Sequence, residues 1–212
     1  MHNTKKTMRQ AVLILTFVLT AIFCFGQKHL EPAKDFNQYP GVLKEYYDNV
    51  FPLLYKGYSE KPIARYTSMP SFSHEYSFSI ETIDSKNYVV SNSLSESYWY
   101  AKSRKNVKLV SNKTELTNDL YFKIVELFKL LEEQTKKPDS DLMGLDGVTY
   151  YFATTDINGQ VKIGETWFPD DNSLLGSLVK ICDNIFSLGN GKNISQTETL
   201  KDIDKLLNDL KQ

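Results

Sequence analysis

The sequence predicts an α+β fold, namely an antiparallel sheet of about five or six strands with helices packed on one face. Three observations lead to this prediction. Residues 71–81 alternate strictly between apolar and polar side chains. Residues 115–138 repeat apolar side chains at helical spacing. Residues 144–169 contain a hairpin signal, and two further helical patterns follow it.

The alternating segment SFSHEYSFSIE, residues 71–81, is the first predicted strand. A period of two places every second side chain on the same strand face. The serines and Glu75 share the face that we expect to meet water. A turn at residues 84–87 leads into a second strand, YVVSNSLS, and we expect SYWYA and VKLV to be strands too. The face expected to meet the core carries Phe72, His74, Tyr76, Phe78 and Ile80.

The residues before this strand have weaker patterns. The polar, proline-containing residues 28–40 predict a loose lead-in. Residues 42–58 have apolar side chains at roughly helical spacing, interrupted by Pro52. Because proline breaks the hydrogen-bond ladder of a helix, we expect a short helix and then a break. Between Pro62 and Pro70 we expect an irregular stretch.

Three helices are predicted after the first strands. Thr117 suits the N-cap of a long helix that ends before Pro138. Asn172 or Ser173 caps the pattern LLGSLVKICDNIFSL, and Ser195 begins a capping box, S-x-x-E, ahead of the last helix. The apolar stripe of the first of these helices consists of Leu120, Ile124, Leu127, Phe128 and Leu131.

The hairpin signal is the dipeptide Asn158-Gly159, since a type I′ turn requires positive φ at both central residues. A two-residue loop at this point pairs Ile157 with Gln160. Opposed residues share a face. This register therefore places Glu165 on one strand face together with the apolar side chains Tyr150, Phe152, Val161, Ile163 and Trp167.

The first 26 residues are typical of a signal peptide. Three basic residues precede an uncharged apolar run, Ala11–Phe25, which suits the h-region of an export signal. We expect cleavage near Gly26 and a periplasmic or secreted protein without a transmembrane segment. Cleavage before Cys24, with lipidation of that cysteine, is the less favoured alternative because Phe23 precedes it.

The expected organisation is then a signal peptide at 1–26, a lead-in with short helices at 27–70, and one α+β domain at 71–212. Residues 41–70 are expected to pack together with this domain. We find no internal repeat and no linker that would divide the chain further.

Composition excludes several classes of protein. Removal of the signal peptide takes away three positive charges and moves the formal charge from -1 to -4. This balance argues against nucleic-acid binding, which needs a concentrated basic surface. One cysteine, Cys182, and two histidines remain, too few for a zinc site or an internal disulfide. We expect no cofactor.

His74 and Glu165 are the candidate catalytic residues. Each is the ionisable member of an otherwise apolar predicted strand face. A glutamate among apolar side chains has its pKa raised by desolvation, as a general acid or base requires. The alternative is that both groups simply reach water at the rim of the core. No nucleophile, phosphate-binding or dinucleotide-binding motif is present.

Two acidic segments allow a weaker metal hypothesis. The segment PDSDLMGLDG carries Asp139, Asp141 and Asp146, which are candidate calcium ligands. Neither this segment nor PDDNS matches the spacing of an EF-hand loop. Turn formation and helix capping explain these aspartates adequately without a metal ion.

Aromatic residues supply candidate ligand-binding positions. In ESYWYAK, Trp99 falls on the opposite strand face from Tyr98, so at least one ring points away from the core. With Trp167, these residues are typical of protein-binding hot spots and sugar-stacking platforms. A sheet rich in strand-favouring residues is the alternative interpretation.

The segments PSFSHEYSFSI, GLDGVTYYF and GETWFP, with the following SLLGSLVKICDNI, are similar to an uncharacterised family of exported proteins of Gram-negative bacteria. The resemblance covers about residues 65–188. It implies an autonomous exported domain and no particular catalytic residue. We therefore expect a non-catalytic binding protein that recognises a protein or glycan through aromatic and acidic surface. The alternative is a hydrolase-like enzyme using His74 and Glu165 as acid and base.

Overall fold

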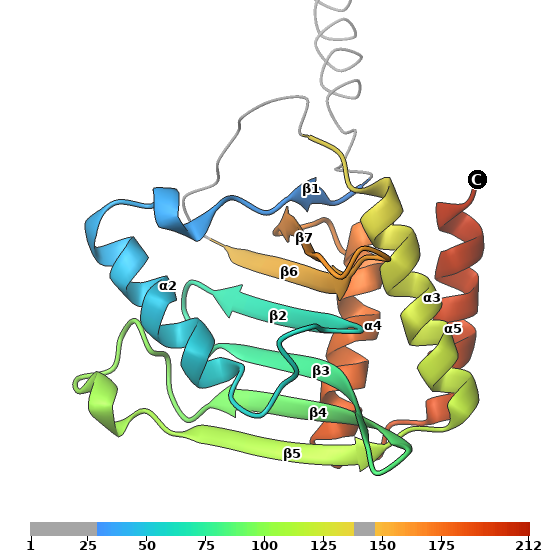
Figure 1. Ribbon diagram of the computed structural model, residues 1–212, viewed down its shortest axis with the longest axis horizontal. Helices are drawn as coiled ribbons and strands as arrows, with labels where there is room; N and C mark the ends of the chain where they lie inside the picture. Colours follow the sequence, from blue (N-terminus) through green and yellow to red (C-terminus); the bar gives the residue numbers. More distant parts are fainter. Residues whose placement is uncertain (1–28, 138–146) are drawn as a thin grey trace, which may run out of the picture.

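The computed structural model describes residues 29–137 and 147–212 and confirms the α+β class (Figure 1). The sheet is antiparallel and has seven strands in the order β1-β7-β6-β2-β3-β4-β5, slightly more than expected. The strands are β1 (Glu31–Pro32), β2 (Arg65–Pro70), β3 (Tyr76–Ile83), β4 (Lys86–Leu94), β5 (Leu109–Glu115), β6 (Val148–Thr155) and β7 (Val161–Trp167).

Within residues 29–137 and 147–212, four α-helices accompany the sheet. They are α2 (Gly41–Leu54), α3 (Asn118–Gln134), α4 (Leu174–Gly189) and α5 (Gln196–Leu210). Two short 3-10 helices, η1 (Phe36–Gln38) and η2 (Arg104–Asn106), lie in the connections. The three expected N-caps are present at Thr117, Ser173 and Ser195, whose side chains each accept a backbone N–H of the first turn.

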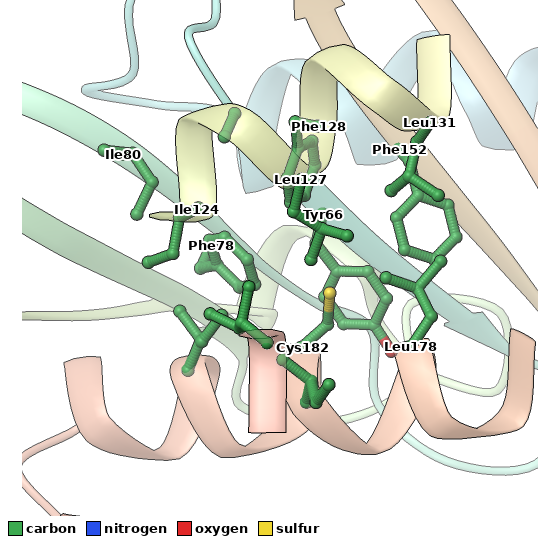
Figure 2. Close-up of a cluster of buried hydrophobic side chains, with 14 of the residues drawn as sticks. Tyr66, Phe78, Ile80, Ile124, Leu127, Phe128, Leu131, Phe152, Leu178 and Cys182 are labelled. Carbon is green, nitrogen blue, oxygen red and sulfur yellow. The ribbon is translucent and has the colours of Figure 1, made fainter. Parts of the chain in front are cut away.

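Helices α3, α4 and α5 cover one face of the sheet (Figure 1). The main core lies between them and the strands, and Figure 2 shows Tyr66, Phe78 and Phe152 of the sheet facing Phe128 of α3 and Leu178 of α4. Cys182 is fully buried in this core, as its helical pattern indicated.

Helix α2 lies on the opposite face, so this face is not open to water where the helix covers it (Figure 1). A second hydrophobic cluster fills the space beneath α2. Its buried members are Tyr46, Val50 and Leu54 of the helix together with Met69, Leu94, Tyr98, Val107 and Tyr151.

This second cluster corrects two expectations. The serines of β3 were expected to meet water, but Ser77 and Ser79 are fully buried, and so is Glu75 just before the strand. The stretch between Pro62 and Pro70 was expected to be irregular, but it contains β2, a central strand. Because β2 is buried on both faces, it lacks the alternation that identifies a half-exposed strand.

Two further segments differ from expectation. Residues 97–101, SYWYA, form a turn and not a strand. The lead-in is attached to the sheet, since β1 pairs with β7 and Leu30 is buried in the main core. The expected end of the signal peptide, with Cys24 and Gly26, lies outside the described residues.

The β6–β7 hairpin differs from the expected register by one residue. Thr155 pairs with Val161, and Gly159 adopts a left-handed φ of 77° in a longer loop closed by Asp156. The carboxylate of Asp156 accepts the backbone N–H groups of Asn158 and Gln160, at 2.9 and 2.8 Å, and this stabilises the longer loop. A shift of one residue exchanges the strand faces. Glu165 therefore lies opposite Tyr151 on the α2 face, not with Phe152 on the main core.

Candidate binding surface

Exposed aromatic side chains collect at the end of the sheet where β2 and β7 finish and β3 and β6 begin, which is the left end in Figure 1. We call this set the aromatic rim. Its members are Phe72, Trp99, Tyr100, Trp167 and Phe168, which are 37 to 72 % exposed.

Four of the five rim residues form two ring pairs. Trp167 and Phe168 have ring centroids 6.1 Å apart. Phe72 and Tyr100 stack with centroids 6.5 Å apart. A backbone connection joins the pairs, because the N–H of Ser71 donates to the carbonyl of Gly147 at 2.9 Å and Gly147 lies against the indole of Trp167. The rim is therefore built on adjacent strand ends.

Phe168 has the least favourable backbone conformation in the rim. Its φ is 39°, in the left-handed region that favours glycine, and its ring is 64 % exposed. A left-handed conformation costs about 1–2 kcal/mol for a residue with a β-carbon. The N–H of Phe168 donates to the carbonyl of Val148 at 2.9 Å, which holds this conformation. Because the ring is mostly exposed, its burial does not offset this strain.

The two predicted aromatics of ESYWYAK have different surroundings. Trp99 belongs to the rim and contacts Tyr46 edge-on at 5.3 Å. Tyr98 is buried in the cluster beneath α2, where its N–H donates to Glu75 at 3.0 Å. Tyr98 therefore supports the surface from below and does not line it.

Glu165 lies beside the rim, two residues before Trp167, and faces tyrosines and not the main core. Burial raises the pKa of its carboxyl above the ordinary value, while the backbone N–H of Lys34 donates to the carboxylate and opposes that shift. Tyr47 and Tyr151, whose hydroxyls are hydrogen bonded to each other, are close enough for the negative charge to act on them.

The structure does not bring His74 and Glu165 together. His74 is exposed and immediately precedes β3, whereas Glu165 belongs to β7. Strands β6 and β2 lie between them, which separates the two chain segments by three strand spacings, or about 14 Å. An acid–base pair acting on one bond would require a much closer approach.

The acidic candidates Asp139, Asp141 and Asp146 lie outside the described residues. Within 29–137 and 147–212, no group of three or more His, Cys, Asp or Glu side chains is arranged to hold a metal ion. Asp170 caps a turn, since its carboxylate accepts the N–H of Asn172 at 2.8 Å.

The sequence did not predict two carboxylates with several partners, the buried Glu75 and the half-buried Asp183. Glu75 accepts the hydroxyl of Tyr46 at 2.5 Å in addition to the N–H of Tyr98. Asp183 of α4 accepts the hydroxyls of Tyr66 and Tyr76 at 2.9 and 2.8 Å, and burial raises its pKa. Each carboxylate thus joins two parts of the chain through two hydrogen bonds.

A buried cation was also missed. Arg65 of β2 is 8 % exposed, and its guanidinium lies 4.5 Å from the ring centroid of Tyr55 and 5.3 Å from that of Tyr58. It also donates to the carbonyl of Ser59. These contacts fasten the turn after α2 to the sheet.

The rim positions Phe72, Tyr100 and Phe168 also escaped prediction. Phe72 continues the core-facing alternation of its segment, but it precedes β3 and is 72 % exposed. No local sequence pattern shows where a strand ends, so the exposure of an aromatic side chain just beyond that end cannot be predicted. The WFP pattern does not predict the conformation of Phe168, because a residue before a proline favours extended backbone and Phe168 has a positive φ.

Comparison with known proteins found no match to a family model, a curated protein or a solved structure. Among the helices of residues 29–137 and 147–212, none has the length and apolar character needed to cross a membrane.

Proposed function

We propose that this protein is an exported, non-catalytic binding protein and that the aromatic rim is its contact surface for a protein partner. The observation that carries the proposal is Phe168, a strained residue with an exposed ring. Strained residues persist where a role other than stability retains them, and exposed aromatic clusters are typical of binding hot spots.

The chemistry of the rim favours a protein partner over a glycan. Its two most exposed rings belong to Phe72 and Phe168, which carry no polar atom. A sugar offers hydroxyls that need hydrogen-bond partners, whereas the apolar surface of a protein is matched by a phenyl ring. Glycan binding is therefore an alternative outcome of the experiment below.

The ionisable groups support binding and not catalysis. The carboxylates of Glu75 and Asp183 have tyrosine hydroxyls as partners, and His74 is distant from Glu165. Export is supported by the basic start and uncharged apolar run within residues 1–26.

Photocrosslinking in the producing cells tests the proposal. Phe72 and, separately, Phe122 are replaced by photoreactive p-benzoylphenylalanine. Phe122 is the matched control because it is a phenylalanine of α3, 64 % exposed and outside the rim. We expect a discrete covalent adduct from position 72 that mass spectrometry identifies as one protein, and none from position 122. The Trp167→Ala change should abolish the adduct.

Equal adducts at both positions, or no adduct at position 72, would contradict the proposal. A glycan array tests the alternative partner. Saturable binding to one glycan that Trp167→Ala removes, without a protein adduct, would replace the protein partner by a sugar.

A further inference from the structure

A cavity of about 270 Å³ lies on the opposite face of the sheet from α2 and is separate from the aromatic rim. Its walls are the C-terminal half of α3, strand β1 with the preceding Leu30, and strands β6 and β7. This volume is slightly below the range of pockets that hold drug-sized ligands. A smaller organic molecule fits it.

The floor of the cavity is apolar. Leu30, Phe128, Leu131 and Phe152 line it, and Figure 2 shows the last three at one end of the main core. The floor is continuous with this core. The apolar part of a ligand would therefore be buried against apolar side chains and removed from water, which favours binding.

Polar side chains stand around the apolar floor, and one of them has no partner. Thr135 and Thr154 donate to the carbonyls of Leu131 and Ile63 at 2.7 and 2.8 Å. The carboxylate of Glu132 is half-buried, and within the described part of the chain no side chain or backbone group bonds to it.

The cation at the cavity is already engaged. The ammonium of Lys162 lies 3.0 Å from the amide oxygen of Gln160 and 3.5 Å from the carboxylate of Asp156. Within the described residues, the charged group of the cavity lining that no hydrogen bond or ion pair engages is therefore the carboxylate of Glu132. Such a carboxylate next to an apolar floor selects a cation that carries a hydrocarbon body.

We infer that this cavity is a binding site for a small amphipathic amine, with the apolar body on Phe128, Leu131 and Phe152 and the ammonium group on Glu132. The site is independent of the proposed rim function, because the two lie on different parts of the sheet.

Calorimetric titration of the purified full-length protein tests this inference with three probes of equal chain length, hexylamine, hexanol and hexanoate. We expect hexylamine to bind saturably with one molecule per chain, hexanol to bind more weakly, and hexanoate not to bind. Glu132→Gln should weaken hexylamine binding by about tenfold or more, since a hydrogen bond to a charged group is lost. Glu133→Gln is the matched control, because Glu133 is exposed and does not line the cavity. It should leave the affinity unchanged.

Thr135→Ile adds carbon atoms to the cavity wall and should reduce binding of both hexylamine and hexanol. If this variant fails to fold, the comparison of the two glutamate variants still decides. The inference is overturned if hexylamine gives no saturable heat up to its solubility limit, if hexanoate binds equally well, or if Glu132→Gln and Glu133→Gln weaken binding to the same extent.

Discussion

At the scale of single residues, most of the ionisable groups described above link one element of the fold to another through hydrogen bonds or ring contacts. Glu75, Asp183 and Arg65 are each engaged by side chains or backbone from another part of the chain. Glu165 differs in degree, because it is half-buried beside the rim and its carboxyl has a raised pKa. Phe168 differs in kind, because its strain is not offset by burial.

The strain at Phe168 predicts an order of stability for two variants that both lack the ring. Phe168→Gly should be about 1 kcal/mol more stable than Phe168→Ala, because glycine adopts positive φ without the clash of a β-carbon. Urea unfolding measures the difference. At Phe122, inside α3, the same pair should show the opposite order, since glycine disfavours a helix. An alanine variant at 168 that equals or exceeds the glycine variant would mean that the backbone there is unstrained.

Glu165 predicts a dependence of stability on pH. Burial raises its folded pKa above the ordinary 4.5, so the folded protein binds more protons than the unfolded chain between these two values. The contribution of this group to stability is therefore fully present below pH 4.5 and is lost as the pH rises through the folded pKa.

Glu165→Gln removes this titration. The free energy of unfolding of the native protein minus that of the variant should decrease as the pH rises from 4 to 7, in urea titrations at constant salt. A difference that stays level or increases with pH would show that desolvation does not dominate at this carboxyl.

At the scale of elements, the sequence determined some features locally and left others to tertiary contacts. The helices α3, α4 and α5 were predictable because each has a capping side chain and an apolar stripe within one segment. The strand β2 was not, because burial on both faces removes its alternation. The hairpin register depended on Asp156 accepting two N–H groups, which favoured a longer loop over the two-residue turn.

The candidate site was predictable only in part, for the same reason. Trp99 and Trp167 were identified from residue type, and both are in the rim. Their neighbours Phe72 and Phe168 are exposed because strands end beside them. Tyr98 is buried, and its backbone N–H donates to the carboxylate of Glu75. These outcomes depend on contacts between residues that are far apart in the sequence.

The contact between α4 and β4 gives a prediction about element packing. A β-carbon on Gly189 would lie 2.0 Å from the hydroxyl oxygen of Ser91, which itself donates to the carbonyl of Phe186 at 2.9 Å. Gly189→Ala should therefore destabilise the protein by about 1–3 kcal/mol. Ser91→Ala removes the obstructing oxygen, so the double variant should be much less destabilised than the sum of the single variants. Additive effects in urea unfolding would show that the helix moves aside freely.

At the scale of the whole molecule, one sheet supports two hydrophobic clusters. The central strand β2 contributes Tyr66 to the main core and Met69 to the cluster beneath α2. Neither cluster persists if the strand is lost. The described chain should therefore unfold as one unit, in spite of having helices on both faces.

Matched truncations on the two faces test this unity. Leu54 of α2 and Leu178 of α4 are both fully buried, and each change to alanine should cost about 2–5 kcal/mol. Both variants should keep a single transition in which tryptophan fluorescence and far-ultraviolet circular dichroism coincide. A Leu54→Ala variant that loses α2 in a separate, earlier transition would show that the two faces are independent.

The pairing of β1 with β7 also determines how much of the chain the sheet needs before its last strand can pair. Glu31 finds its partner in Glu165, 134 positions later, whereas β3, β4 and β5 pair with their neighbours along the chain. The three-stranded meander can therefore form from one continuous segment of the chain, whereas β2 pairs on its other side with β6, which follows α3. Among the strands, β1 is the last that can pair, because β7 ends at Trp167, and α4 and α5 still follow β7 in the chain. Until β1 pairs, β7 remains an unpaired edge of the sheet.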